Sequence, residues 1–178
     1  MTKYAKTYAG ALYDLAAEEG KEDVILQDLQ LFCDSLKEMP EYRKLLSTPA
    51  VPKEERKELV KQAWGEALNQ YTMNFICMLC DGNAISEILD CEEEFKNRYN
   101  ADKGIAEVTV TSAVALSDSQ KTALIAAVEK KIGKKVVLNE KTDPSIIGGL
   151  KLSAAGREYD GSIAYHLNSI AALLSGNN

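Results

Sequence analysis

The apolar residues of this 178-residue chain first change their spacing at residues 100–105. Before that point they recur every three or four positions, which is the spacing of an amphipathic helix. After it the stretch IAEVTVTSAV alternates, with Ala106, Val108 and Val110 on one face, and alternation is the period of a half-buried strand. The sequence therefore predicts two domains, residues 1–104 and residues 105–178.

Six amphipathic segments divide the first domain and predict a helical bundle. Gly20 and Gly82 are expected to end helices, because glycine adopts the left-handed conformation without a Cβ clash. Pro52 fits the first turn of a helix, where its missing N–H costs nothing, and Asn69 is expected to cap the next helix. The first segment carries a stripe of large residues beside a stripe of small ones: Tyr4, Tyr8, Leu12 and Leu15 beside Ala5, Ala9 and Ala16.

The second domain mixes strand and helix signals. Ser117-Asp-Ser-Gln120 is typical of a capping box, in which the serine and glutamine side chains satisfy each other's backbone donors. The helix that follows is expected to end at Gly133, and KKVVLNEK and IIGGLKL are expected strands. REY is a candidate fourth strand, and residues 163–174 are expected to form a final helix. This order predicts a small α/β domain. The fold class is therefore α+β, a six-helix N-terminal bundle followed by a small C-terminal α/β domain.

Composition and charge argue against several kinds of partner. The chain carries 27 acidic and 21 basic residues, a net charge of −6, whereas nucleic-acid binders rely on neutralising phosphates. No apolar run approaches the roughly 20 residues that span a bilayer, so direct membrane insertion is not expected. The start MTKYAKTYAG lacks the apolar core of a signal peptide. Four cysteines without such a signal are expected to be reduced thiols.

The cysteines form the pattern Cys77-x-x-Cys80, and Cys33 and Cys91 bring the count to four thiols. Four thiolates are enough for a zinc site. All four cysteines lie in expected helices among apolar neighbours, however, and cysteine is often buried for its own sake. Core packing is therefore the preferred interpretation, and neither a metal nor a cofactor is expected. No arrangement of residues supplies a nucleophile, a base and an orienting group together, so no catalytic residue is assigned.

The double glycine Gly148-Gly149 raises the question of a phosphate-binding loop. Such loops follow a strand and open directly into a helix, whose N-terminal N–H groups bind the anion. Here LKLSAAG follows the glycines, and the expected helix starts only after Asp160-Gly161-Ser162. We interpret the glycines as backbone geometry within a strand, Asp-Gly as a turn and Ser162 as a helix cap.

Two stretches resemble one protein family. YAKTYAGALYDLAAEEG resembles the opening of the delta subunit of F-type ATP synthases, which is related to the mitochondrial oligomycin-sensitivity-conferring protein. DPSIIGGLKLSAAGREYDGSIAYHLNSI is similar to the C-terminal signature of that family. In this signature an apolar run with Gly149 leads to a short hydrophobic strand, and Asp160, Ser162 and the last helix follow. The resemblance extends over essentially the whole chain.

The resemblance implies a non-catalytic stator subunit that resists rotor torque during proton-driven ATP synthesis. Its N-terminal domain would bind the catalytic head, and its C-terminal domain, with Gly149, Asp160 and Ser162, would bind the peripheral stalk of b subunits. In the family, a groove between the first and fifth helices takes the N-terminal helix of an alpha subunit. The carried-over lining is Tyr8, Ala11, Leu12, Leu15, Phe75, Met78 and Leu79. The implied location is the cytoplasmic face of a bacterial cell membrane, as a peripheral protein.

Other functions stay open beside the stator. A general two-domain interaction adaptor would share this architecture without binding the alpha helix. A thiol-based metal or redox protein would hold zinc or a cysteine of low pKa, and a small phosphate-using enzyme would bind nucleotide in residues 105–178. The candidate groove residues also have a structural alternative, because an apolar residue of a bundle helix often faces the core.

Overall fold

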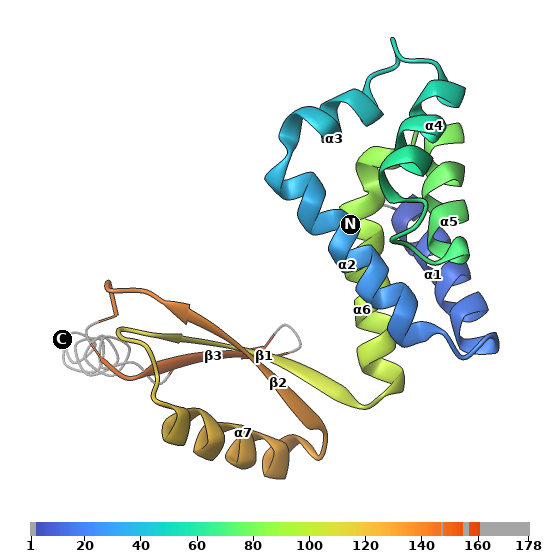
Figure 1. Cartoon of the computed structure of the whole chain (residues 1–178). Coiled ribbons are helices and arrows are strands. Elements are labelled where there is room, and N and C mark those ends of the chain that lie inside the picture. Colours follow the sequence, from blue (N-terminus) through green and yellow to red (C-terminus); the bar gives the residue numbers. More distant parts are fainter. Residues whose placement is uncertain (1–2, 147, 155–156, 161–178) are drawn as a thin grey trace, which may run out of the picture. The chain divides into compact units, whose positions relative to one another are not determined.

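The chain divides into two compact units, Met1–Tyr99 and Asn100–Asn178. This is a computed structural model, and it describes residues 3–146, 148–154 and 157–160. The division falls inside the last helix before the sheet, a few residues ahead of the change in apolar spacing. Helices fill the first unit, and the described part of the second combines one helix with a sheet (Figure 1). The mixed helix and sheet class predicted from the sequence is confirmed.

The helices of the first unit follow one another through short connections. None of the described helices is both long enough and apolar enough to cross a bilayer. The elements are α1 Lys3–Glu18, α2 Glu22–Glu38, α3 Pro40–Ser47, α4 Lys53–Trp64, α5 Gln70–Asp81, the 3₁₀ turn η1 Ile85–Glu87 and α6 Ile88–Asp102, the last of which runs past the division between the units.

One hydrophobic core holds these helices together. Aromatic residues from four helices meet in it, edge to face: Tyr13 with Phe95 at 5.3 Å between ring centroids, and Phe32 with Trp64 at 5.6 Å. Edge-to-face pairs add to the free energy gained by burying the rings. The buried residues of α1 are mostly small, together with one leucine and one tyrosine: Ala5, Ala9, Gly10, Leu12, Tyr13 and Ala16.

Most helix ends follow the expected local chemistry. Asn69 caps α5, its side chain accepting a hydrogen bond from the Tyr71 N–H at 3.1 Å. Gly20 has φ +62 after the end of α1. Pro52 differs from its expected place in the first turn. It is the residue before α4, with ψ 144, and its carbonyl accepts from the Arg56 N–H at 3.0 Å.

A buried arginine ties the C-terminal turn of α3 to the loop after α5. Arg56 of α4 is only 2% exposed. Its guanidinium donates to the Leu46 carbonyl at 3.2 Å and to Asn83 Oδ1 at 2.7 Å. Asn83 has φ +52, a left-handed conformation that asparagine adopts more readily than most residues. The α5 helix therefore stops at the expected Gly82, but Asn83 takes the left-handed turn.

The second unit contains a mixed four-stranded sheet in the order β2-β1-β3-β4. β1 pairs parallel with β2 and antiparallel with β3, and β3 pairs antiparallel with β4. The parallel pair needs a crossover, which α7 supplies. The capping box at Ser117 and Gln120 is present, and Gly133 ends the helix with φ +71. The elements are β1 Ile105–Ser112, α7 Asp118–Ile132, β2 Lys135–Thr142, β3 Leu150–Ala154 and β4 Arg157–Asp160.

The strand register places one apolar face of the sheet under α7. Val108 and Val110 are buried, as the alternation predicts, while Ala106 is half-buried. Leu152 lies opposite Val110, so it shares that face. At the edge of the face Lys121 of α7 forms an ion pair with Glu140 of β2 at 2.7 Å. The expected helix 163–174, Ser162 and the lone histidine, His166, lie outside the described residues.

The double glycine lies before a strand and not inside one. Gly148 and Gly149 form a bend, and β3 begins at Leu150. Gly149 has φ +87, a value that extended strand residues do not adopt. The expectation of glycines within the third strand is therefore corrected, and the physical reason is this left-handed φ.

Candidate partner-binding surface

Burial lowers the reactivity of the thiols. Cys33, Cys80 and Cys91 are fully buried, and Cys77 is half-buried. Burial raises the pKa of Cys80 to about 11 and that of Cys91 to about 12. Burial also raises the pKa of Cys33 and of Cys77. A thiol with a raised pKa is a poor nucleophile and a poor metal ligand at neutral pH. Within the described ranges, no three His, Cys, Asp or Glu residues converge on a metal position.

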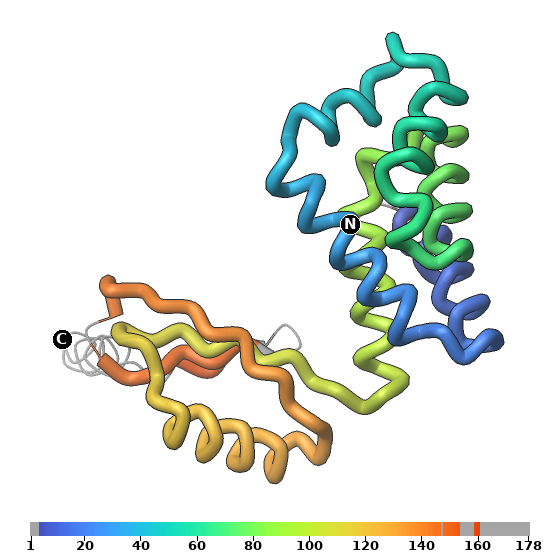
Figure 2. Tube along the Cα trace, in the orientation of Figure 1, coloured from blue at the N-terminus to red at the C-terminus, as the bar shows by residue number. Residues whose placement is uncertain are grey.

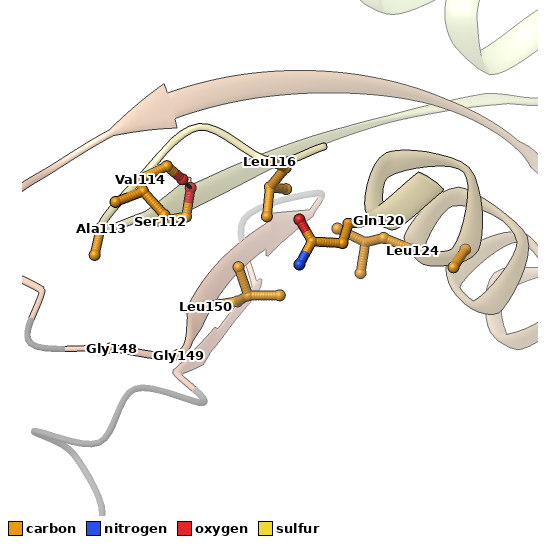
Figure 3. Close-up of a pocket in the computed structure, with 10 residues that line it drawn as sticks. Ser112, Ala113, Val114, Leu116, Gln120, Leu124, Gly148, Gly149 and Leu150 are labelled. Carbon is orange, nitrogen blue, oxygen red and sulfur yellow. Dashed lines mark hydrogen bonds between the residues drawn. The ribbon is translucent and has the colours of Figure 1, made fainter. Parts of the chain in front are cut away.

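A cavity of about 560 Å³ adjoins the double glycine in the second unit (Figure 3). Most of its lining is backbone and aliphatic side chain. Gln120 is a polar exception, but its side chain accepts from the Ser117 N–H at 2.9 Å in the capping box. A phosphate site needs cationic side chains or converging N–H groups, and none of the described residues that line the cavity is charged. The lining is Ser112, Ala113, Val114, Leu116, Gln120, Ala123, Leu124, Gly148, Gly149 and Leu150.

The first unit exposes large apolar side chains along one side of α1. Tyr4 is 69% exposed and Leu15 is 39% exposed, and between them Tyr8 is half-buried and Ala11 exposed. These four positions are spaced by four, three and four residues, so they form a single stripe along the helix. The Tyr4 and Tyr8 rings stack with 6.4 Å between centroids.

The same unit ties the end of α1 to the start of α5. The ammonium group of Lys21, just after α1, lies 4.6 Å from the ring centroid of Tyr71. A hydrogen bond to Glu19 raises the pKa of the Tyr71 hydroxyl. These contacts place the C-terminal end of α1 beside the N-terminal end of α5. On α5 Met78 is 43% exposed. We use the name α1–α5 surface for these exposed or half-buried positions on the two helices: Tyr4, Tyr8, Ala11, Leu15 and Met78.

The seven residues proposed for a groove separate into two groups. Tyr8, Ala11, Leu15 and Met78 belong to the α1–α5 surface. Leu12, Phe75 and Leu79 are buried, at 5%, 5% and 1% exposure, and pack in the hydrophobic core. The three core residues therefore leave almost no side-chain area exposed for contact with a partner.

Sequence reasoning missed Tyr4 as a surface residue. Its signal is its spacing of four residues from Tyr8, which places both rings on one side of α1.

The residues singled out in the second unit are only partly described. Asp160 forms an ion pair with Lys151 at 3.2 Å, across the register of β4 and β3. Gly149 is exposed at the start of β3. Asp160 therefore joins the edge strand to its neighbour, and Gly149 provides the bend that lets β3 begin.

These features define a class of protein: a two-unit protein with exposed apolar side chains on helices of its first unit and three of its four thiols buried in the core. Residues 4–174 match the family described as ATP synthase delta (OSCP) subunit, and the chain belongs to that family. It is thus a non-catalytic stator component of an ATP synthase.

Curated relatives match along nearly the full length. The chain is 35% identical over 167 residues to ATP synthase subunit delta of Shouchella clausii (strain KSM-K16), covering 93% of this chain and 92% of the relative. It is also 35% identical over 166 residues to the subunit delta of Halalkalibacterium halodurans, covering 92% and 90%.

A solved structure shares the fold. The match is to a chain in the mitochondrial ATP synthase hexamer of Toxoplasma gondii, with a TM-score of 0.80. The two are 18% identical, and the alignment covers 97% of this chain and 98% of that one. The fold of the described residues therefore recurs at low sequence identity.

Proposed function

We propose that this chain links the catalytic head of an F-type ATP synthase to its peripheral stalk, at the cytoplasmic face of a bacterial membrane. In this proposal the first unit acts as a six-helix bundle that binds the N-terminal helix of an alpha subunit. The second unit binds the b subunits of the stalk. The link resists rotor torque while ions drive ATP synthesis. Family membership and the division into two compact units support this arrangement.

The α1–α5 surface is the observation that carries the proposal for the head. An amphipathic partner helix binds through apolar side chains at positions i, i+3, i+4 and i+7. The α1 stripe presents side chains at a matching spacing, and Met78 adds a flexible thioether from α5. Ala11 lies between two bulky positions of the stripe, so a partner backbone can approach closely there.

A subunit under torque needs slow dissociation from both neighbours. Nanomolar affinity corresponds to about 12 kcal/mol of binding free energy. Exposed anchors such as Leu15 and Met78 are few, so one helix contact is expected to supply only part of that amount. Holding the head and the stalk at the same time raises the effective affinity for each, because the second contact is intramolecular.

Titration calorimetry with a synthetic alpha N-terminal peptide tests the head contact. The variant Ala11→Asp places a charge in the middle of the α1 stripe, and we expect peptide affinity to fall at least about tenfold, because a buried unpaired carboxylate is costly. Ala17→Asp is the matched control, since Ala17 is exposed on the opposite side of the same helix. Unchanged binding by a folded Ala11→Asp variant would contradict the surface assignment. Failure of the wild-type chain to bind the peptide would favour the alternative function, a general interaction adaptor.

A further inference from the structure

Four lysines lie within six residues where α7 ends and β2 begins. Lys130 and Lys131 are in the last turn of α7, and Lys134 and Lys135 follow the left-handed turn at Gly133. All four side chains are exposed. We call these four residues the lysine cluster. The chain turns there from α7 into β2, as Figure 2 shows.

The lysine cluster has no carboxylate partner among the residues whose side chains the structure describes. Elsewhere lysines are paired: Lys57 with Asp81 at 2.9 Å, and Lys121 with Glu140 at 2.7 Å. The nearest acidic residue in the sequence, Glu129, uses its carboxylate to accept from the Val136 N–H at 3.0 Å. Neighbouring like charges repel, so the cluster is an uncompensated positive region.

The helix dipole explains only part of the cluster. Lys130 and Lys131 interact favourably with the carbonyl groups at the end of α7. Lys134 and Lys135 lie beyond the helix, where that effect is small. The distribution of charge along the chain also isolates the cluster. Residues 1–99 hold 12 basic and 19 acidic residues, whereas residues 100–178 hold 9 basic and 8 acidic residues.

Exposed apolar side chains accompany the lysines. Ile132 is 39% exposed, between the two halves of the cluster. Lys131 reaches over the ring of Tyr159, which is 51% exposed, with 5.2 Å from the ammonium to the ring centroid. Aromatic and aliphatic anchors ringed by charge are typical of a protein-binding surface.

We propose that the lysine cluster, with Ile132 and Tyr159, binds an acidic amphipathic helix of the peripheral stalk. This inference rests on the proposed function, because it specifies the surface through which the second unit holds that stalk. The apolar residues enter the partner's apolar stripe, and the lysines face carboxylates on either side of that stripe. A partner helix with those carboxylates supplies the charges that the cluster lacks.

A protein helix fits this surface better than a membrane or a nucleic acid does. Membrane-surface helices carry a broad apolar face, whereas Ile132 is the only large apolar side chain of α7 that is classed as exposed. Nucleic-acid affinity grows with the number of phosphates neutralised. The net charge of −6 on the whole chain opposes that kind of binding.

The test measures binding of the full chain to the recombinant soluble part of its own organism's stalk b subunits. The variant Lys130→Gln/Lys131→Gln/Lys134→Gln/Lys135→Gln removes the cluster. A matched control, Lys37→Gln/Lys44→Gln/Lys53→Gln/Lys61→Gln, removes the same charge from exposed lysines of the first unit. Each variant is also titrated with the alpha N-terminal peptide, and its fold is checked by circular dichroism.

We expect the cluster variant to bind the stalk fragment at least about tenfold more weakly, at roughly twofold or more per charge. We also expect its affinity to depend less on NaCl concentration than that of wild type, because fewer exposed charges remain to be screened. The control variant should match wild type, and both variants should bind the alpha peptide normally.

Stalk binding by the cluster variant with wild-type affinity and salt dependence would overturn the inference and leave the proposed function standing. Failure of the wild-type chain itself to bind the stalk fragment would overturn both. Cluster-dependent binding to vesicles of anionic phospholipid, without cluster-dependent binding to the fragment, would overturn the inference in favour of a lipid surface.

Discussion

A hydrogen bond joins Asp28 of α2 to Thr72 of α5 inside the first unit. The carboxylate accepts it from the threonine hydroxyl, with 2.9 Å between the two oxygens. The same oxygen accepts from the Asn69 N–H at 2.7 Å. Asp28 is 8% exposed and Thr72 is fully buried. This one carboxylate therefore positions the start of α5, the helix that supplies Met78 to the α1–α5 surface.

Removal of that carboxylate should destabilise the first unit. Asp28→Ala leaves the Thr72 hydroxyl and the Asn69 N–H without an acceptor, so we expect a loss of about 2–4 kcal/mol in the free energy of unfolding. Urea titration followed by circular dichroism measures it. Thr72→Val keeps the shape and removes only one donor, so its loss should be smaller. A loss below about 0.5 kcal/mol for Asp28→Ala would show that the bond contributes little.

The bend before β3 should depend on a single glycine. Gly149 has φ +87, so Gly149→Ala should cost about 1–2 kcal/mol of stability. Gly82 has φ −78, so Gly82→Ala is the control at a glycine of ordinary backbone conformation and should leave the second unit unchanged. Hydrogen exchange of the β1 and β3 amides follows the stability of the second unit alone. Equal protection in the two variants would contradict the role of the left-handed bend.

The stability of the second unit should fall in acid through Glu140. Hydrogen bonds from Lys121 and from the Leu116 N–H lower the pKa of this carboxyl below its ordinary value of 4.5. A lowered folded-state pKa stabilises the fold above about pH 4.5, and that stabilisation is lost as pH falls through the folded value. Glu140→Gln should therefore lose stability at neutral pH and show a shallower decline below pH 4.5. Thermal melts across this range check it, and identical profiles would contradict it.

The four thiols should react in a definite order. Cys77 is half-buried, whereas the other three cysteines are buried. Ellman's reagent at pH 8 should therefore label one thiol slowly in the folded chain and the remaining three only after unfolding. Cys77→Ser should abolish the native-state labelling. Rapid reaction of Cys33 or Cys91 in the folded chain would instead indicate that the core around α2 and α6 opens readily.

Local patterns in the sequence predicted much of the fold, because they depend on neighbours along the chain. The alternation at Val108 and Val110 identified the buried face of β1, and the spacing of Ser117 and Gln120 identified the capping box that starts α7. Backbone strain was less visible: the left-handed residue after α5 is Asn83 and not the glycine before it.

Sequence periodicity could not predict which side of α1 is buried. The helical spacing placed Leu12 and Leu15 in one stripe of large residues. In the structure Leu12 joins the alanines in the core, while Leu15 stays exposed with Tyr4. Most of the residues that face inward on α1 are small, and Tyr4 and Leu15 remain exposed. Periodicity identifies both stripes, but only tertiary packing decides which one is buried.

ATP synthesis by membrane vesicles most directly tests the claim that the chain is a mechanical link acting through the α1–α5 surface. Vesicles from the source organism, depleted of this subunit, are energised after adding back wild-type chain, Ala11→Asp or Ala17→Asp. The account predicts that wild type and Ala17→Asp restore synthesis, while folded Ala11→Asp restores little. Full restoration by Ala11→Asp, or synthesis that does not depend on the chain at all, would contradict it.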